Sequence, residues 1–222
     1  MTAGTDDRVR VTGVADPLAG LIAEAAGRAL AAVGRDLRTP GVMICVDDLP
    51  GAEEIPWYGS LDPDAPHKKS LVLYCSREAF LEPVPSATIL GGGLEIWERS
   101  PLPPPDEDDP DSRFSISAAD RFLHHHFVFA ADVLDRTVDM SLIPRPVQAA
   151  FQAAWSVTVD GRLERSRLPG YSLPLRRGMF SRLFAGSGIL LPDHWKIFRS
   201  LWDGDLATQD DVLAAVRRLP LL

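Results

Sequence analysis

The sequence has few cysteines, and their positions exclude a disulfide-rich protein. Its 222 residues include only Cys45 and Cys75, each within an apolar stretch typical of a strand. No pair of cysteines or histidines has the spacing of a structural zinc site. We therefore expect two buried, reduced thiols and no disulfide.

Long apolar runs and a surplus of positive charge are also missing. No stretch approaches the roughly 18 apolar residues of a membrane span. Residues 1–13 carry acids early and lack the apolar core of a secretory signal. With 31 acidic and 23 basic residues, the formal net charge is −8, whereas nucleic-acid binding usually needs a basic surplus. We expect a cytoplasmic protein that binds neither membrane nor nucleic acid.

Common catalytic and phosphate-binding motifs are absent as well. There is no G-x-S-x-G nucleophile elbow, and neither cysteine has a histidine nearby in the sequence. The glycine-rich "LGGGLE" at 90–95 lacks the Lys-Ser/Thr of a phosphate loop and does not match G-x-G-x-x-G. It indicates a strand entry or bulge instead.

Apolar periodicity predicts strands in the first half of the chain and helices in the second. The expected strands are 8–14, 41–48, 70–75 and 90–98. The expected helices are 16–37, 115–136, 145–167, 175–188, 192–204 and 208–220, the last beginning at a capping box of Thr208 and Asp211. Residues 49–69 and the acidic, proline-rich segment 100–113 are expected to be loops.

This segregation favours an α+β fold over a parallel α/β sheet. We expect one domain over 1–222, with a small twisted sheet and a helix on it at about 8–99. The acidic loop follows at 100–113, and a helical C-terminal portion at 114–220.

Three of the five histidines are adjacent in "SAADRFLHHHFVFAADVLD", residues 117–135. Neighbouring helical positions point about 100° apart, so these three cannot ligate one ion. His126 is predicted on a broad apolar face, with Ile116, Ala119, Phe122, Leu123, Phe127, Ala130, Val133 and Leu134. Asp120 and His124 lie four residues apart on its flank, and His125 shares a face with Arg121, Phe129 and Asp132. Asp120 and His124 are therefore either a helix-surface pair or two metal ligands.

The segment "DRFLHHHF" resembles the zincin helix motif H-E-x-x-H, in the version followed by a further His and a Phe. Asp120 occupies the place of the first ligand, Arg121 that of the catalytic Glu and His124 that of the second ligand. The segments "VMICVDDLP" and "SLVLYCSREAF" resemble strands of the small, minimal gluzincin-type metallopeptidases of bacteria. "AAFQAAWSVTVDGRLERSRLPG" resembles their second helix. The resemblance covers about residues 10–168.

The resemblance implies a zincin-like fold with helices packed on the sheet. If a metal binds, it implies zinc held by Asp120, His124 and an acidic third ligand, Asp160 before Glu164. Arg121 cannot act as the base that activates water, because a guanidinium stays protonated. A hydrolase then needs a substitute base such as Glu95 or Glu164.

The first hypothesis is a zincin-like protein that has lost peptidase activity, needs no cofactor and acts as a binding or scaffold module for a protein or peptide. The second is a metal-dependent hydrolase with ligands Asp120, His124 and Asp160. The third is a helical interaction module that never bound metal.

Two local patterns allow more than one interpretation. "VTVDGRLE" could form a hairpin turning at Asp160-Gly161, which would remove Asp160 as a ligand. Trp195, Phe198 and Trp202 share one face of a predicted helix, which suits docking on the domain, or a partner site if exposed. Four arginines in this half could serve an anionic partner or form a solvated face: Arg176, Arg177, Arg182 and Arg199.

Overall fold

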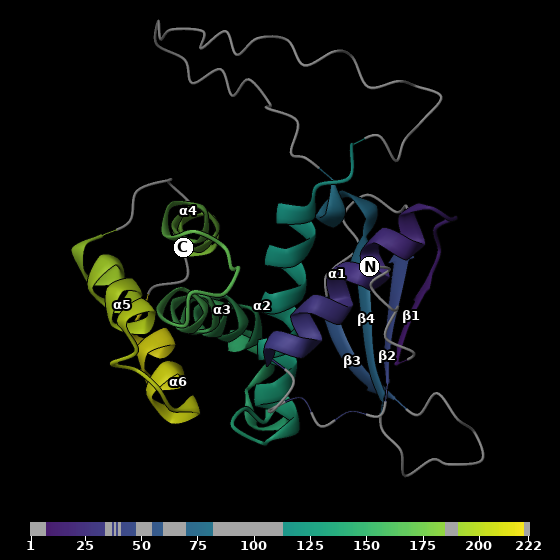
Figure 1. The fold of residues 1–222 in the computed structure, drawn as a ribbon. Helices are drawn as coiled ribbons and strands as arrows, with labels where there is room; N and C mark the ends of the chain where they lie inside the picture. The colour runs from purple at the N-terminus through teal and green to yellow at the C-terminus, as the bar shows by residue number, and fades with distance from the viewer. Residues whose placement is uncertain are drawn as a thin grey trace, which may run out of the picture.

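A single helix, α2 (Ile116–Leu134), lies between the two parts of the fold (Figure 1). The computed structural model describes residues 8–33, 37, 39, 41–47, 55–59, 70–81, 113–184 and 191–219. A small sheet covered by α1 (Leu18–Val33) stands on one side of α2, and the remaining helices stand on the other. The expected α+β fold with a helical C-terminal portion is confirmed.

The sheet has four strands in the order β1-β2-β4-β3. Three of them run parallel: β1 (Val9–Thr12), β2 (Val42–Asp47) and β4 (Ser70–Ser76). The sequence pattern did not predict this parallel pairing. It requires a crossover between neighbouring strands, and α1 supplies the one between β1 and β2.

The fourth strand, β3 (Ile55–Gly59), pairs antiparallel with β4 at the edge of the sheet. We expected a loop here, and that expectation was wrong. Pro56 lies inside β3, opposite Leu73. An edge strand tolerates proline because its outer side makes no ladder bonds, so proline is weak evidence against a strand. The predicted strand at 90–98 and most of the predicted loop at 100–113 lie outside the described residues.

Every predicted helix is present, with ends within a few residues of the expected ones. After α2 follow α3 (Gln148–Arg165), α4 (Leu173–Phe184), α5 (Pro192–Asp203) and α6 (Gln209–Arg218). Short 3₁₀ turns occur at Arg77–Phe80, Met140–Leu142 and Arg145–Val147. The capping box at the start of α6 is confirmed. No helix in the described ranges has the length and apolarity needed to cross a bilayer.

The helix α2 is buried on more than one side, so the predicted division into an apolar face and a polar flank was wrong. Phe122 and Phe127 pack into a core with the sheet and α1, whereas Phe129 packs into a second core with α3. His126 is buried, as predicted, but so are His124 and His125. Ile116, placed on the apolar face, is 60% exposed because it begins the helix beyond the edge of the core.

The second core is rich in aromatic side chains from α3, α4 and α5. Phe198 and Trp202 are buried in it, which confirms the expected docking face of α5. Trp195, on the same face, is half-buried beneath the guanidinium of Arg177, whose Cζ lies 3.7 Å from the centre of the indole ring.

Gly161 allows α3 and α5 to come close together. A β-carbon at this position would lie 2.1 Å from the backbone oxygen of Trp202. Glycine weakens a helix interior, but at position 161 it is required because α5 crosses α3 there. The chain from Gln148 to Arg165 is one helix, which excludes the hairpin at Asp160-Gly161.

We predict that Gly161→Ala lowers the free energy of unfolding by about 3 kcal/mol, because overpacking at the crossing outweighs the better helix propensity of alanine. Gly178→Ala is the matched control: Gly178 lies in α4, where an added β-carbon meets nothing within 4 Å. There the substitution should gain up to about 1 kcal/mol. Urea unfolding of both variants measures the difference. Equal effects at the two sites would contradict the assignment of a tight α3–α5 contact.

His194 on α5 is 1% exposed, and neither of its ring nitrogens has a hydrogen-bond partner among the described residues. Such unsatisfied groups destabilise the folded state, so we predict that His194→Leu raises the free energy of unfolding by about 1 kcal/mol. His125→Leu should do the opposite, by about 2 kcal/mol, since it removes a donor from a buried carboxylate. A destabilised His194→Leu protein would show that the imidazole makes a contact of its own.

Candidate functional site

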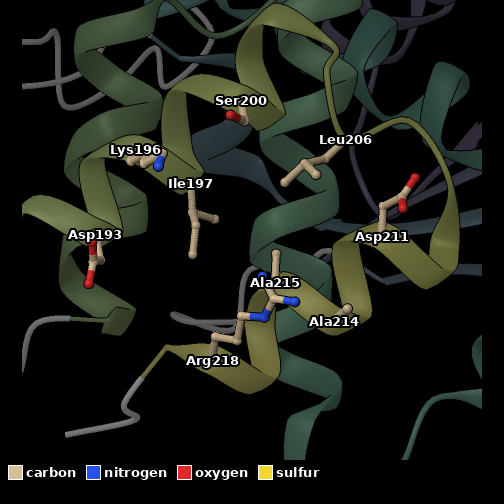
Figure 2. Close-up of a pocket in the computed structure, with 9 residues that line it drawn as sticks. All are labelled: Asp193, Lys196, Ile197, Ser200, Leu206, Asp211, Ala214, Ala215 and Arg218. Carbon is tan, nitrogen blue, oxygen red and sulfur yellow. The ribbon is translucent and has the colours of Figure 1, made fainter.

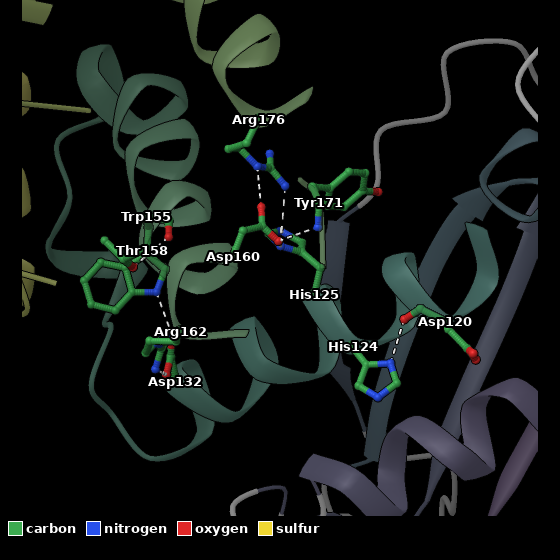
Figure 3. A network of polar contacts seen from close by, with 10 residues as sticks. All are labelled: Asp120, His124, His125, Asp132, Trp155, Thr158, Asp160, Arg162, Tyr171 and Arg176. Atoms are coloured by element: carbon green, nitrogen blue, oxygen red, sulfur yellow. Dashed lines mark hydrogen bonds and ion pairs between the residues drawn. The ribbon is translucent and has the colours of Figure 1, made fainter. Parts of the chain in front are cut away.

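A buried polar cluster joins α2, α3 and α4, and the carboxylate of Asp160 on α3 is its centre (Figure 3). Its Oδ1 lies 2.9 Å from Nδ1 of His125 on α2 and accepts a hydrogen bond of 3.1 Å from the backbone N–H of Tyr171. Its Oδ2 accepts from Nε of Arg176 on α4. Asp160 is 1% exposed, and the side chains of His125 and Arg176 are also buried.

The local structure explains how these residues meet. His125 lies on the side of α2 that also carries Phe129 and Asp132, and this side faces α3. After α3 the chain turns back through Arg167, which has a positive φ of 57°. A β-carbon on Gly170 would lie 3.3 Å from Oδ1 of Asp160, so the small residue lets the returning chain approach the carboxylate.

The hydrogen bonds determine the tautomer of His125. Nδ1 must carry the proton, because it lies 2.9 Å from a carboxylate oxygen that can only accept. Nη2 of Arg176 is 3.4 Å from the same nitrogen, and two donors facing each other make no hydrogen bond. In the neutral imidazole the lone pair is therefore on Nε2. This is the arrangement in which a carboxylate orients a histidine as a base or a metal ligand.

Burial and charge keep the cluster in one protonation state at neutral pH. Burial lowers the pKa of His125 to about 4, helped by the nearby charge of Arg176 and opposed by Asp160. Burial alone raises the pKa of Asp160, but its contact with His125, the charge of Arg176 and the Tyr171 N–H together hold that pKa below its usual value. His125 is thus neutral and Asp160 ionised.

Tyr171 brings a second guanidinium to the cluster. Cζ of Arg176 lies 4.6 Å from the centre of the Tyr171 ring, and Cζ of Arg121 lies 5.2 Å from it. Both arginines gain cation–π attraction from the ring. With Asp160 as the single negative charge and His125 neutral, the five residues carry a net charge of about +1.

The predicted metal ligands lie on two different sides of α2. Asp120 forms an ion pair of 2.9 Å with Arg28 on α1. His124 donates from Nδ1 to the backbone oxygen of Asp120 at 2.7 Å, whereas Asp160 faces α2 from α3 (Figure 3). Within the described ranges, no three or more His, Cys, Asp or Glu side chains are grouped to hold a metal ion. The structure thus separates Asp120 and His124 from Asp160, and a zinc site formed by the three stays a prediction.

Of the two residues considered as substitute bases, Glu164 lies in the described part of the chain. Glu164 accepts a hydrogen bond of 2.7 Å from Nε1 of Trp202 on α5, which ties its carboxylate to the α3–α5 contact. Glu95 lies outside the described residues.

Sequence reasoning selected His124, missed the role of His125, and considered Arg176 only for an anionic partner or a solvated face, whereas Arg176 is buried. The sequence did hold a signal for His125, because it shares a helix face with Phe129 and Asp132. A large apolar residue and an acid on one face indicate that this face also packs against another element. Asp132 is buried against α3, where it accepts a hydrogen bond of 2.8 Å from Nε1 of Trp155 and pairs with the guanidinium of Arg162. Asp132 on α2 and Asp160 on α3 thus each bind a side chain of the other helix.

No family model matches the chain, and no curated protein or solved structure matches it either. The functional argument therefore depends on the geometry and charge of the cluster.

We predict that His125 makes the protein sensitive to mild acid. Unfolded histidine takes up a proton near pH 6.5 and folded His125 only near pH 4, so in this window the unfolded chain binds more protons and acid favours unfolding. The stability present above pH 6.5 is lost as the pH falls to about 4, by at most about 3 kcal/mol.

His125→Asn keeps an N–H donor near Asp160 but cannot titrate, so its stability should fall less over the same range. Chemical unfolding of both proteins at a series of pH values measures the difference. Parallel curves for the two proteins would contradict a buried neutral His125. Below the ordinary aspartate pKa of 3.8, both proteins should lose further stability as Asp160 becomes protonated.

Proposed function

We propose that this protein is a binding module without peptidase activity, built on a zincin-like scaffold, whose partner is a protein or a peptide. A zincin needs an open metal position and a carboxylate that takes a proton from the metal-bound water. The proposal depends mainly on one observation: Asp160, the acid that α3 directs toward α2, already accepts from His125, Tyr171 and Arg176. Both of its oxygens accept hydrogen bonds within the fold, and its charge is paired with Arg176.

The charges around Asp160 also oppose hydrolysis. Arg121 and Arg176 place two permanent positive charges beside Tyr171, which disfavours a metal cation at the same place. His125 is oriented like a base, but a pKa of about 4 weakens its proton affinity by roughly 3 kcal/mol relative to an ordinary histidine. A base works best when its pKa is near the working pH.

The order of elements supports the scaffold part of the proposal. The resemblance implies a helix, two strands, the motif helix and a second helix, and α1, β2, β4, α2 and α3 follow in this order, with β1 and β3 as additional strands. Helices α2 and α3 pack together, and an acid on α3 faces a histidine on α2. That histidine is His125, the neighbour of the motif residue His124, which lies on another side of α2. In our proposal the ion-pair cluster, and not a metal, joins the two helices.

The test combines metal analysis with a peptidase assay. We expect purified protein to contain no stoichiometric zinc, to unfold at the same temperature with and without EDTA, and to leave a mixture of peptides uncut. Asp120→Ala and His124→Ala serve as matched variants and should leave all three results unchanged. Cleavage that EDTA abolishes and added Zn²⁺ restores, lost in both variants, would establish the alternative, a hydrolase with ligands Asp120, His124 and Asp160.

A further inference from the structure

A half-open groove of about 410 Å³ lies between α5 and α6 on the outside of the helical half (Figure 2). Both helices pack on α3, and the groove is the space left between them. Its lining comes from one face of each helix and from the connecting loop: Asp193, Lys196, Ile197, Ser200, Leu206, Asp211, Ala214, Ala215 and Arg218.

The shape of the groove suits a third helix. The lining residues of α5 and those of α6 recur at steps of three and four, so each helix presents a continuous stripe to the space between them. Ile197 and Leu206 point into it and offer apolar contact (Figure 2). Ala214 and Ala215 have small side chains, so another helix can approach the backbone of α6 closely at this place.

The groove is lined by two acids, both at helix N-termini, and by two cations. Asp211 caps α6 together with Thr208, and Asp193 lies in the first turn of α5, so both acids offset the positive ends of their own helices. Lys196 on α5 and Arg218 on α6 form no ion pair with any described residue. One such cation thus stands on each wall.

A half-open groove favours a peptide over a small molecule. Sites for small molecules usually bury most of the ligand surface, which an open groove does not. An amphipathic helix, in contrast, buries one face and leaves the other in water. Acidic residues along the flanks of that helix would meet the two cations.

We propose that the α5–α6 groove binds an amphipathic helical segment of a partner protein, with apolar residues against Ile197 and Leu206 and acidic residues beside Lys196 and Arg218. This inference rests on the proposed function as a binding module and names its binding surface and the chemistry of its partner.

The probe is a designed helical peptide of about 14 residues with leucines at helical spacing and glutamates on both flanks. A second peptide with lysine in place of each glutamate is the control. Isothermal titration calorimetry measures both affinities, and backbone NMR shifts locate the binding. We expect the glutamate peptide to bind the full chain at least about tenfold more tightly, with shifts concentrated on α5 and α6.

The double variant Lys196→Glu/Arg218→Glu should reverse the preference between the two peptides. Arg199→Glu/Arg217→Glu changes exposed cations on the same two helices that do not line the groove, and should leave the preference unchanged. Circular dichroism verifies that all variants fold.

Three results would overturn the groove proposal: no binding of the glutamate peptide, equal affinity for both peptides, or shifts outside α5 and α6. Full displacement of the peptide by octanoate would assign the groove to a small carboxylate instead. Because the peptidase assay is independent, a peptide that neither binds nor is cut refutes the groove alone, whereas metal-dependent cleavage refutes the proposed function.

Discussion

The buried carboxylate of Asp160 is the interaction on which the arrangement of the helices depends. It accepts from α2, from α4 and from the chain between α3 and α4, so one side chain orders three helices. Removing one partner from such a buried ion pair typically costs about 3–5 kcal/mol, because the other charge is left unpaired in the core. Since α2 also packs on α1 and the sheet, Asp160 indirectly links the helical half to the sheet half.

This structural role limits what the same residues do chemically. The carboxylate of Asp160 already accepts from a histidine, an arginine and a backbone N–H, so binding a metal there would compete with contacts that hold the helices together. The Asp160 carboxylate thus has a structural role in holding the helices together. Function is then best sought away from the α2–α3 contact, for example at the two cations of the α5–α6 groove, which form no ion pair with any described residue.

Much of the fold was predictable because helical periodicity and caps are local properties of the sequence. The capping box of Thr208 and Asp211 and the aromatic face of α5 were found from spacing alone. The face of α2 was not, since a helix buried against both α1 and α3 has no single apolar side. Edge strand β3 was predicted as a loop because it contains Pro56. The parallel pairing was not predicted because the residue pattern of a strand does not determine its pairing direction. The candidate site depended on Arg176, a residue 51 positions from His125 that only the folded chain brings to it.

The close crossing at Gly161 has a consequence for recognition. The backbone oxygen of Trp202, near the end of α5, lies against Gly161 on α3 and also accepts from Arg165. Helix α5, one wall of the α5–α6 groove, is therefore fixed against α3 before a partner binds. The protein itself then loses little conformational entropy on binding. Most of the entropy cost of binding then falls on the partner segment, so its intrinsic helix propensity would influence the dissociation rate of the complex.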